Sequence, residues 1–161
     1  MTFPDPTLEA NGQEAAVIIG LTVLGEAEGE SELGKSAVAH VIVNRMKLRH
    51  KSAQDTCLAP WQFSCWNEGC VREQFLQDTI KKASANIPVG LWSSCWVAAH
   101  NALSGLSADP TQGATHYTTT NIWGVDDAKR KRPRWHSRQE IEAERTVETM
   151  RLGGHVFGRA A

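Results

Sequence analysis

Two adjacent apolar segments decide the fold: QEAAVIIGLTVLGEAE at residues 13–28 and SELGKSAVAHVIVNRMKL at residues 31–48. In the first, Val17, Leu21, Leu24 and Glu28 recur at helical spacing. Ile18, Ile19 and Val23 widen the apolar surface beyond one stripe, which predicts a helix that is mostly buried. We expect Gly29 to end this helix.

The second segment predicts another helix, which Ser31 is suited to cap at its N-terminus. Its apolar stripe is formed by Leu33, Ala37, Val41 and Leu48, with Val38 and Ile42 beside it.

The rest of the chain predicts smaller elements. Further helices are expected at residues 71–85 (polar and exposed), 93–104 (stopped by Gly105) and 137–150 (polar). Residues 50–70 are typical of a loop-rich segment, and residues 129–135 of a basic loop. The segment 109–121 predicts a turn into a short strand, and Gly153-Gly154 a turn into a final strand at 155–157. The fold class is therefore α+β, mainly helical with a small β element.

Length and composition indicate one ordinary globular domain. The chain has 161 residues, of which 41% are hydrophobic and 22% charged, with a formal net charge of -1. We assign residues 1–13 to an N-terminal tail and 14–161 to the domain. No stretch has the apolar length of a membrane span, and the polar start lacks the features of a secretory signal. We therefore expect synthesis in the cytoplasm and no stable membrane insertion.

The four cysteines, Cys57, Cys65, Cys70 and Cys95, do not form any CxxC pair. That spacing argues against a structural zinc site and favours buried or half-buried thiols. A disulfide between Cys57 and Cys70 is the alternative in an oxidising compartment.

The most informative motif is GEAEGE at residues 25–30, at the junction of the first two predicted helices. Glu26 directly follows the apolar run and is the best candidate for partial burial. Burial disfavours the charged form of a carboxyl group, which suits a general acid acting near neutral pH. Glu28 is expected to be solvated or paired. Glu30 lies at the start of the next helix, where it can interact favourably with the helix dipole.

GEAEGE followed by LGKSAVAHVIVNRM resembles the signature of the SleB/CwlJ family of cell-wall hydrolases, which includes spore-cortex lytic enzymes and phage endolysins. The resemblance continues through QFSCWN (62–67), DPTQGATHY (109–117) and GGHVFGR (153–159). These blocks follow one another in the same order over residues 14–159, a more specific signal than any one motif.

The resemblance implies a compact lysozyme-like domain without a cofactor or metal. It also implies that the protein cleaves the β-1,4 bond between N-acetylmuramic acid and N-acetylglucosamine in peptidoglycan glycan strands. Lytic transglycosylation, which leaves 1,6-anhydromuramic ends, is the expected reaction, and Glu26 matches the family's catalytic glutamate. A monomeric phage endolysin that reaches the wall through a separate holin pore is the expected context.

Other matched positions are expected to shape the substrate groove. Glu30, Tyr117, Ser64 and Gln62 are candidates to support Glu26, and for a buried tyrosine hydroxyl some hydrogen-bond partner is expected in any case. Candidate substrate-binding residues are Asn44, Arg45, Phe63, His116 and Trp123. His155 is interpreted as structural. The chain departs from the family at Glu28, where arginine is frequent, and at His116-Tyr117, where two aromatic residues are frequent; both departures bear on substrate preference.

Three alternatives stay open from the residues alone. A muramidase would hydrolyse the same bond with water. A zinc amidase or peptidase would draw ligands from His40, His100, His116 and His155, although no HExxH motif is present. A non-catalytic wall-binding module would use the basic run from Lys129 to Arg134 with Trp135. One basic cluster in a chain without net positive charge argues against nucleic acid as a partner.

Overall fold

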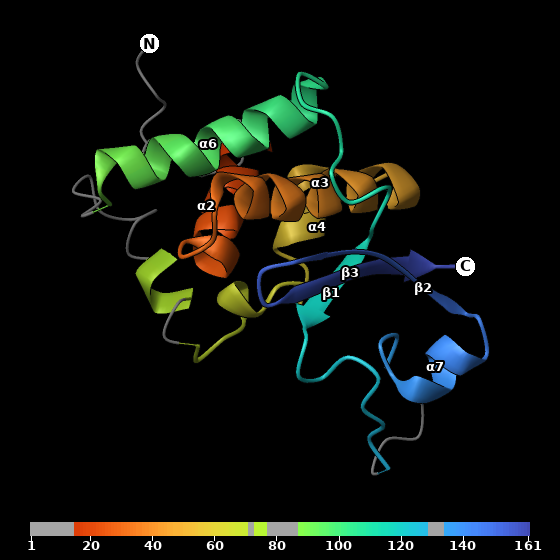
Figure 1. The fold of residues 1–161 in the computed structure, drawn as a ribbon. Coiled ribbons are helices and arrows are strands. Elements are labelled where there is room, and N and C mark those ends of the chain that lie inside the picture. Colours follow the sequence, from red (N-terminus) through yellow and green to blue (C-terminus); the bar gives the residue numbers. More distant parts are fainter. Residues whose placement is uncertain (1–14, 71–72, 77–86, 129–133) are drawn as a thin grey trace.

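In the computed structural model, residues 15–70, 73–76, 87–128 and 134–161 are described. The fold is built on two helices, α2 (Ala15–Ala27) and α3 (Glu32–Arg49). Figure 1 shows a third long helix, α6 (Val89–Ser104), running along the outer side of this pair, and the sheet on the other side of α3. The described part of the chain is mainly helical with a small sheet, as the sequence predicts.

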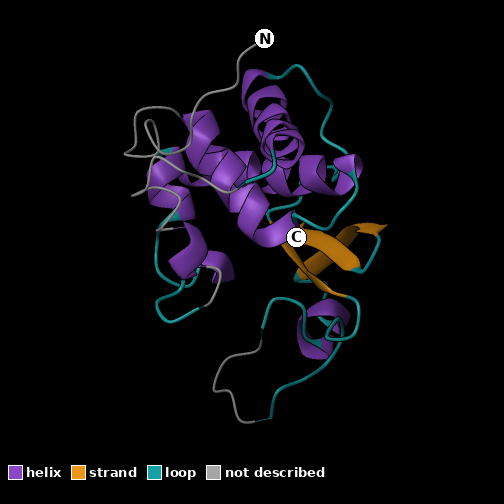
Figure 2. Ribbon diagram, turned by 90° about the vertical axis from the view of Figure 1, so that its left-hand side faces the viewer, coloured by secondary structure: helices purple, strands orange, loops and turns teal. Residues whose placement is uncertain are grey.

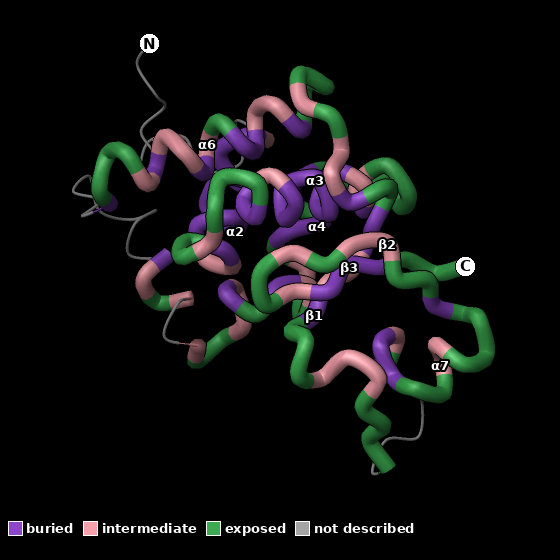
Figure 3. The backbone as a smooth tube through the Cα atoms, viewed as in Figure 1, coloured by how far each residue is buried: buried purple, intermediate pink, exposed green. Residues whose placement is uncertain are grey.

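Helix α2 is the centre of the core. Ten of its thirteen residues are buried, so the helix is apolar around most of its circumference, as its sequence predicts. It packs against α3, α6 and the short helix α4 (Ala53–Cys57). Figure 3 shows the buried backbone concentrated in α2 and α3.

Helix α3 begins where the sequence predicts. The side chain of Ser31 caps it by accepting a hydrogen bond of 3.2 Å from the backbone of Gly34. The apolar stripe is confirmed at Ala37 and Val41, which are fully buried, but it is wrong at Leu33 and Leu48, which are 49% and 66% exposed. Both leucines lie within two residues of a helix end, where the neighbouring elements no longer cover the helix.

A three-stranded antiparallel sheet holds the C-terminal part of the chain. Its order is β1 (His116–Thr119), β3 (His155–Ala160) and β2 (Thr146–Leu152). Tyr117 of β1 pairs with Phe157 of β3. Figure 2 shows the sheet beside the helical layer, with the short helix α7 (Arg138–Glu142) beyond it.

The predicted helix at 137–150 is wrong beyond its first turn. Ser137 caps α7, but the helix ends at Glu142, and Glu144 adopts a left-handed backbone with φ of 56°. From Thr146 the chain forms β2, which suits the β-branched residues of the sequence TVET. The pairing with β3 outweighs the helix propensity of the charged residues.

Smaller predictions have mixed outcomes. Helix α6 begins four residues earlier than predicted but ends at the predicted Gly105, whose φ is 73°. The loop-rich segment 50–70 contains α4 and the 3-10 turn η1 (Ser64–Trp66). Most of the predicted helix at 71–85, all of the tail at 1–13 and residues 129–133 of the basic loop lie outside the described residues. Within the described residues, no helix combines the length and apolarity needed to cross a bilayer.

Candidate active site

Two segments distant in sequence from α2 converge on the carboxylate of Glu26. Its Oε1 accepts hydrogen bonds from the backbone N–H of Cys65, at 2.8 Å, and from the hydroxyl of Ser64, at 3.1 Å. Its Oε2 accepts a bond of 2.6 Å from the hydroxyl of Tyr117. Glu26 is half-buried near the end of α2, with donors from η1 and β1 around it. The carboxylate is therefore fixed in position rather than free to rotate in solvent.

The position of η1 depends on the residue before Glu26. A Cβ atom on Gly25 would lie 2.6 Å from the Cβ of Cys65, which is closer than real side chains approach. Glycine at position 25 thus lets η1 lie directly on α2. One turn earlier on α2, the Thr22 hydroxyl accepts a bond of 3.0 Å from the indole N–H of Trp66. Together these contacts bring the Cys65 N–H within reach of Glu26.

Tyr117 is held from its other side by aromatic rings of β3. Its ring lies 5.8 Å from that of Phe157 and 5.7 Å from that of His155, the latter edge-on. Burial raises the pKa of the Tyr117 hydroxyl well above its ordinary value, and the neighbouring Glu26 raises it further. The hydroxyl therefore stays protonated and serves as a donor to Glu26.

Asn44 and Arg45 dock the chain that leads into β1. The Asn44 side-chain amide donates to the carbonyl of Ala114, at 2.9 Å, and the Arg45 Nε donates to the carbonyl of Thr115. Adjacent residues of α3 thus bind adjacent carbonyls just before the strand that carries Tyr117. Arg45 also donates to the carbonyl of Gln62, at 3.2 Å, and its guanidinium lies over the Phe63 ring. Arg45 is 6% exposed, so it ties two walls of the site together from inside.

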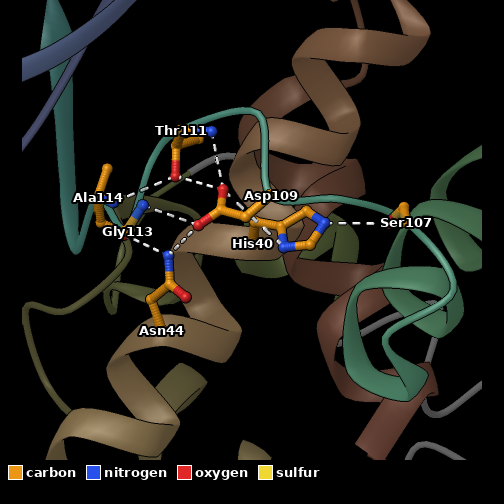
Figure 4. Close-up of polar contacts among 7 residues, drawn as sticks. All are labelled: His40, Asn44, Ser107, Asp109, Thr111, Gly113 and Ala114. Carbon is orange, nitrogen blue, oxygen red and sulfur yellow. Dashed lines mark hydrogen bonds and ion pairs between the residues drawn. The ribbon is translucent and has the colours of Figure 1, made fainter.

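Figure 4 shows the network that fixes the preceding loop, from Ser107 to Ala114. The carboxylate of Asp109 accepts bonds from Asn44 and from the backbone N–H groups of Thr111 and Gly113. These bonds and that of the Thr111 hydroxyl hold the pKa of Asp109 below its ordinary value against the opposing effect of burial. The buried His40 contacts the Ser107 hydroxyl at 2.9 Å. Asn44, predicted to bind substrate, lies in this loop anchor instead of the cavity wall.

A cavity of about 470 Å³ opens over Glu26. This volume lies within the ordinary range for ligand pockets. Among the predicted site residues, those that line it are Glu26, Arg45, Gln62, Phe63, Ser64 and Tyr117. Of the described residues that line it, Glu26 is the single carboxylate.

Three further predicted residues lie outside the wall of this cavity. His116 precedes Tyr117 on β1 but does not line the cavity, and it lies against Trp135, with ring centroids 5.1 Å apart. Trp123 also packs on Trp135, at 5.6 Å. Glu30 is set back behind His155, whose Nδ1 lies 3.3 Å from Glu30 Oε1.

Several lining residues were not predicted from sequence. His155, interpreted as structural, lines the cavity, as do Asn67 and Thr119. Thr119 had a usable signal, because residues two apart on a strand share a face and Tyr117 was already a candidate. Asn67 ends the quoted block QFSCWN. His155 had no local signal, since it reaches the site only through the pairing of β3 with β1.

The four histidines of the zinc alternative lie in separate contacts. His40 lies at Ser107, His116 at Thr115 and His155 at Glu30. His100 stacks on Trp96, with ring centroids 4.8 Å apart. Across the described part of the chain, no three histidine, cysteine or acidic residues are grouped as metal ligands.

All four cysteines are free thiols, so the disulfide alternative is wrong for this structure. Cys57, Cys65 and Cys95 are buried, as the sequence favours, and Cys70 is half-buried. Burial raises the pKa of Cys57 and Cys95 to about 12, so these thiols are protonated and unreactive near neutral pH.

Two comparisons with known proteins bear on the family and the fold of this chain. The family described as Cell Wall Hydrolase matches residues 29–158. The crystal structure of the catalytic domain of the Bacillus cereus SleB protein superimposes with a TM-score of 0.59 and 20% identity. That match covers 99% of this chain and 100% of the SleB chain, and at this identity it speaks for the fold alone. No curated protein sequence matches the chain. The family match begins three residues after Glu26, so the case for Glu26 rests on the geometry around it.

Proposed function

Since this chain belongs to the cell wall hydrolase family, and so degrades peptidoglycan, we propose that it is a lytic transglycosylase with Glu26 as its acid and base. It cleaves the β-1,4 bond between N-acetylmuramic acid and N-acetylglucosamine. The observation that carries the proposal is the single carboxylate among the described residues lining the cavity. Glycosidases that use water or a protein nucleophile employ two carboxylates beside the scissile bond. A transglycosylase needs one, because its nucleophile belongs to the substrate.

The first step is proton transfer. Protonated Glu26 donates its proton to the glycosidic oxygen, the bond to C1 of the muramic sugar breaks, and oxocarbenium character develops on that ring. Glu26 is left as a carboxylate. Hydrogen bonds from Tyr117, Ser64 and the Cys65 N–H then stabilise the charge that the departing proton leaves behind.

The second step closes a ring within the substrate. The C6 hydroxyl of the muramic sugar attacks C1 and passes its proton to the Glu26 carboxylate. Atoms balance without water, and Glu26 returns to its starting form. The attacking hydroxyl is already attached to the reacting sugar, so it loses far less entropy than a water molecule captured from solvent.

Hydrolysis is the second candidate, and one contact favours it. His155 lines the cavity, and its Nδ1 lies 3.3 Å from Glu30 Oε1. In the neutral tautomer whose proton lies on Nδ1, facing Glu30, the other ring nitrogen of His155, Nε2, can accept a proton from water. A water activated in this way would make the enzyme a muramidase with reducing muramic ends.

Mass spectrometry of the fragments released from purified peptidoglycan separates these reactions. The proposal predicts 1,6-anhydromuramic ends, which are lighter than reducing ends by one water. Reducing muramic ends would replace it with hydrolysis, and then His155→Gln should abolish activity. Cleaved peptide stems would contradict both glycosidase mechanisms and revive the amidase alternative.

We also propose that the protein acts as a phage endolysin, a role that the sequence resemblance includes. Its activity would then be confined until a pore admits it to the wall. The test is expression in a bacterial cytoplasm with and without a holin. Lysis only when the holin is present supports the role, whereas lysis without any pore contradicts it.

A further inference from the structure

The turn at residues 59–62 places a tryptophan where backbone geometry favours glycine. The N–H of Gln62 donates to the carbonyl of Ala59 at 3.2 Å, which closes a four-residue turn with Pro60 and Trp61 at its centre. Trp61 has a φ of 63°. Proline followed by a positive φ is the pattern of a type II turn, whose third position is normally glycine or asparagine. A bulky side chain there is strained, so Trp61 is retained at a cost to stability.

The Trp61 side chain does not recover that cost by packing in the core. It is 83% exposed, the most exposed large hydrophobic residue in the described part of the chain. Strained residues that contribute little to packing occur preferentially at functional sites. We therefore expect the indole of Trp61 to have a functional role, since it does not stabilise the fold.

Trp61 stands between two cavities. It lines the cavity over Glu26, and it also lines a second cavity of about 450 Å³ together with Leu58, Pro60 and Trp66. Asn67 is likewise shared by both. The two cavities therefore adjoin across Trp61 and Asn67. Leu58 is 44% exposed, so the second cavity presents apolar surface to solvent.

The turn is also held rigidly. Arg45 donates to the Gln62 carbonyl, and the Arg49 guanidinium donates to the Gln62 side-chain oxygen at 2.6 Å. A rigid aromatic face costs little conformational entropy when it binds a ligand. These clamps fix Trp61 relative to Glu26, since Arg45 also anchors the segment that leads to Tyr117.

We propose that Trp61 is a sugar-stacking platform that carries the glycan strand from the Glu26 cavity into the second cavity. The apolar face of a pyranose ring packs on the indole, and Asn67, with its polar side chain, lies at the same junction. The inference rests on the proposed function, because it assumes that the occupant is a glycan strand. Trp61 would bind a sugar beyond the bond that is cleaved, so its role is in the recognition of long strands rather than in the chemical step.

The test compares Trp61→Gly and Trp61→Phe with wild type on purified glycan strands separated by length. Leu106→Ala serves as the control, because Leu106 is 71% exposed and lines neither cavity. Trp61→Gly should raise KM for long strands about three- to tenfold, the range of one lost aromatic contact. KM for the shortest cleaved strands should stay within about twofold of wild type. Trp61→Phe should fall in between, and Leu106→Ala should match wild type.

Thermal unfolding separates a binding role from a structural one. Because glycine relieves the positive φ, Trp61→Gly should unfold at or above the wild-type Tm. A clear fall in its Tm, or an equal loss on long and short strands, would overturn the proposal. So would an unchanged KM on every length.

A second readout does not depend on turnover. Glu26→Gln and Glu26→Gln with Trp61→Gly are compared for co-sedimentation with insoluble purified peptidoglycan. Weaker binding of the double variant supports the platform, and equal binding contradicts it. Failure of the wild type to produce glycan fragments would instead contradict the proposed function, so the two failures are distinguishable.

Discussion

The hydroxyl of Tyr117 lies 2.6 Å from Oε2 of Glu26, although the two residues are 91 positions apart. The contact joins the helical layer to the sheet at the point where the cavity opens. Asn44 and Arg45 of α3 hold the segment that leads into β1, and Gly25 leaves room for η1 against α2. Both arrangements place hydrogen-bond donors around the Glu26 carboxylate.

Tyr117→Phe should lower kcat by on the order of 10- to 100-fold, the effect of losing one hydrogen bond to a charged group. KM should change little, since the ring still packs on Phe157. The free energy of unfolding should fall by about 1.5–3 kcal/mol, the range for a hydrogen bond to a charged group. Steady-state kinetics and urea denaturation check both values.

Ser64→Ala is the matched control for that prediction. Its bond to Glu26 is longer, at 3.1 Å, and exposed, so kcat should fall less than in Tyr117→Phe. Equal or larger loss in Ser64→Ala would contradict the leading role assigned to the tyrosine.

Arg45→Lys should destabilise the fold by about 2–4 kcal/mol, because lysine cannot reach both buried carbonyls, of Thr115 and Gln62, at once. Arg49→Lys, on the exposed side of the same helix, should change stability by less than about 0.5 kcal/mol. Urea denaturation of the two variants measures the difference. Similar stability of both would show that Arg45 is not the internal clamp inferred here.

His116 should make the protein less stable in mild acid. Burial, with help from Arg45 and Arg49, lowers the pKa of His116 from 6.5 to about 4 in the folded state. As the pH falls through this interval, the unfolded chain gains a proton before the folded one does, so the free energy of unfolding decreases.

His116→Gln should therefore lose less stability than wild type between about pH 7 and about pH 4.5. Urea denaturation at both pH values measures this. His40, whose pKa burial also lowers, remains in the variant, so part of the dependence persists. An unchanged dependence in His116→Gln would contradict the assignment.

The parts of the fold that the sequence predicts well are those set by local patterns. The apolar periodicity of α2, the Ser31 cap and the stop at Gly105 are each contained within one element. The strand β2 was missed because residues 137–150 were interpreted as one polar helix, whereas pairing with β3 across the turn at Gly153-Gly154 sets the conformation from Thr146 onward.

In the candidate site, too, features set by local sequence were predicted and roles set by long-range contacts were not. Glu26 was identified from its position after an apolar helix and from the family resemblance. The roles of Asn44 and Arg45 were not predictable, because most of their partners are backbone carbonyls up to 70 residues away, which any sequence would supply. Trp61 had no specific signal in the sequence, because its positive φ and its exposure become evident only in the fold.

The most direct test of the central claim is the rate at which Glu26→Gln releases glycan fragments from purified peptidoglycan, measured beside Glu28→Gln. Glu28 is exposed and lies two residues further along the same segment, which makes it the matched control. We predict that Glu26→Gln keeps the wild-type Tm and binds peptidoglycan but releases no fragments, while Glu28→Gln cleaves at close to the wild-type rate. Fragment release by a folded Glu26→Gln variant at a rate near wild type would contradict the account.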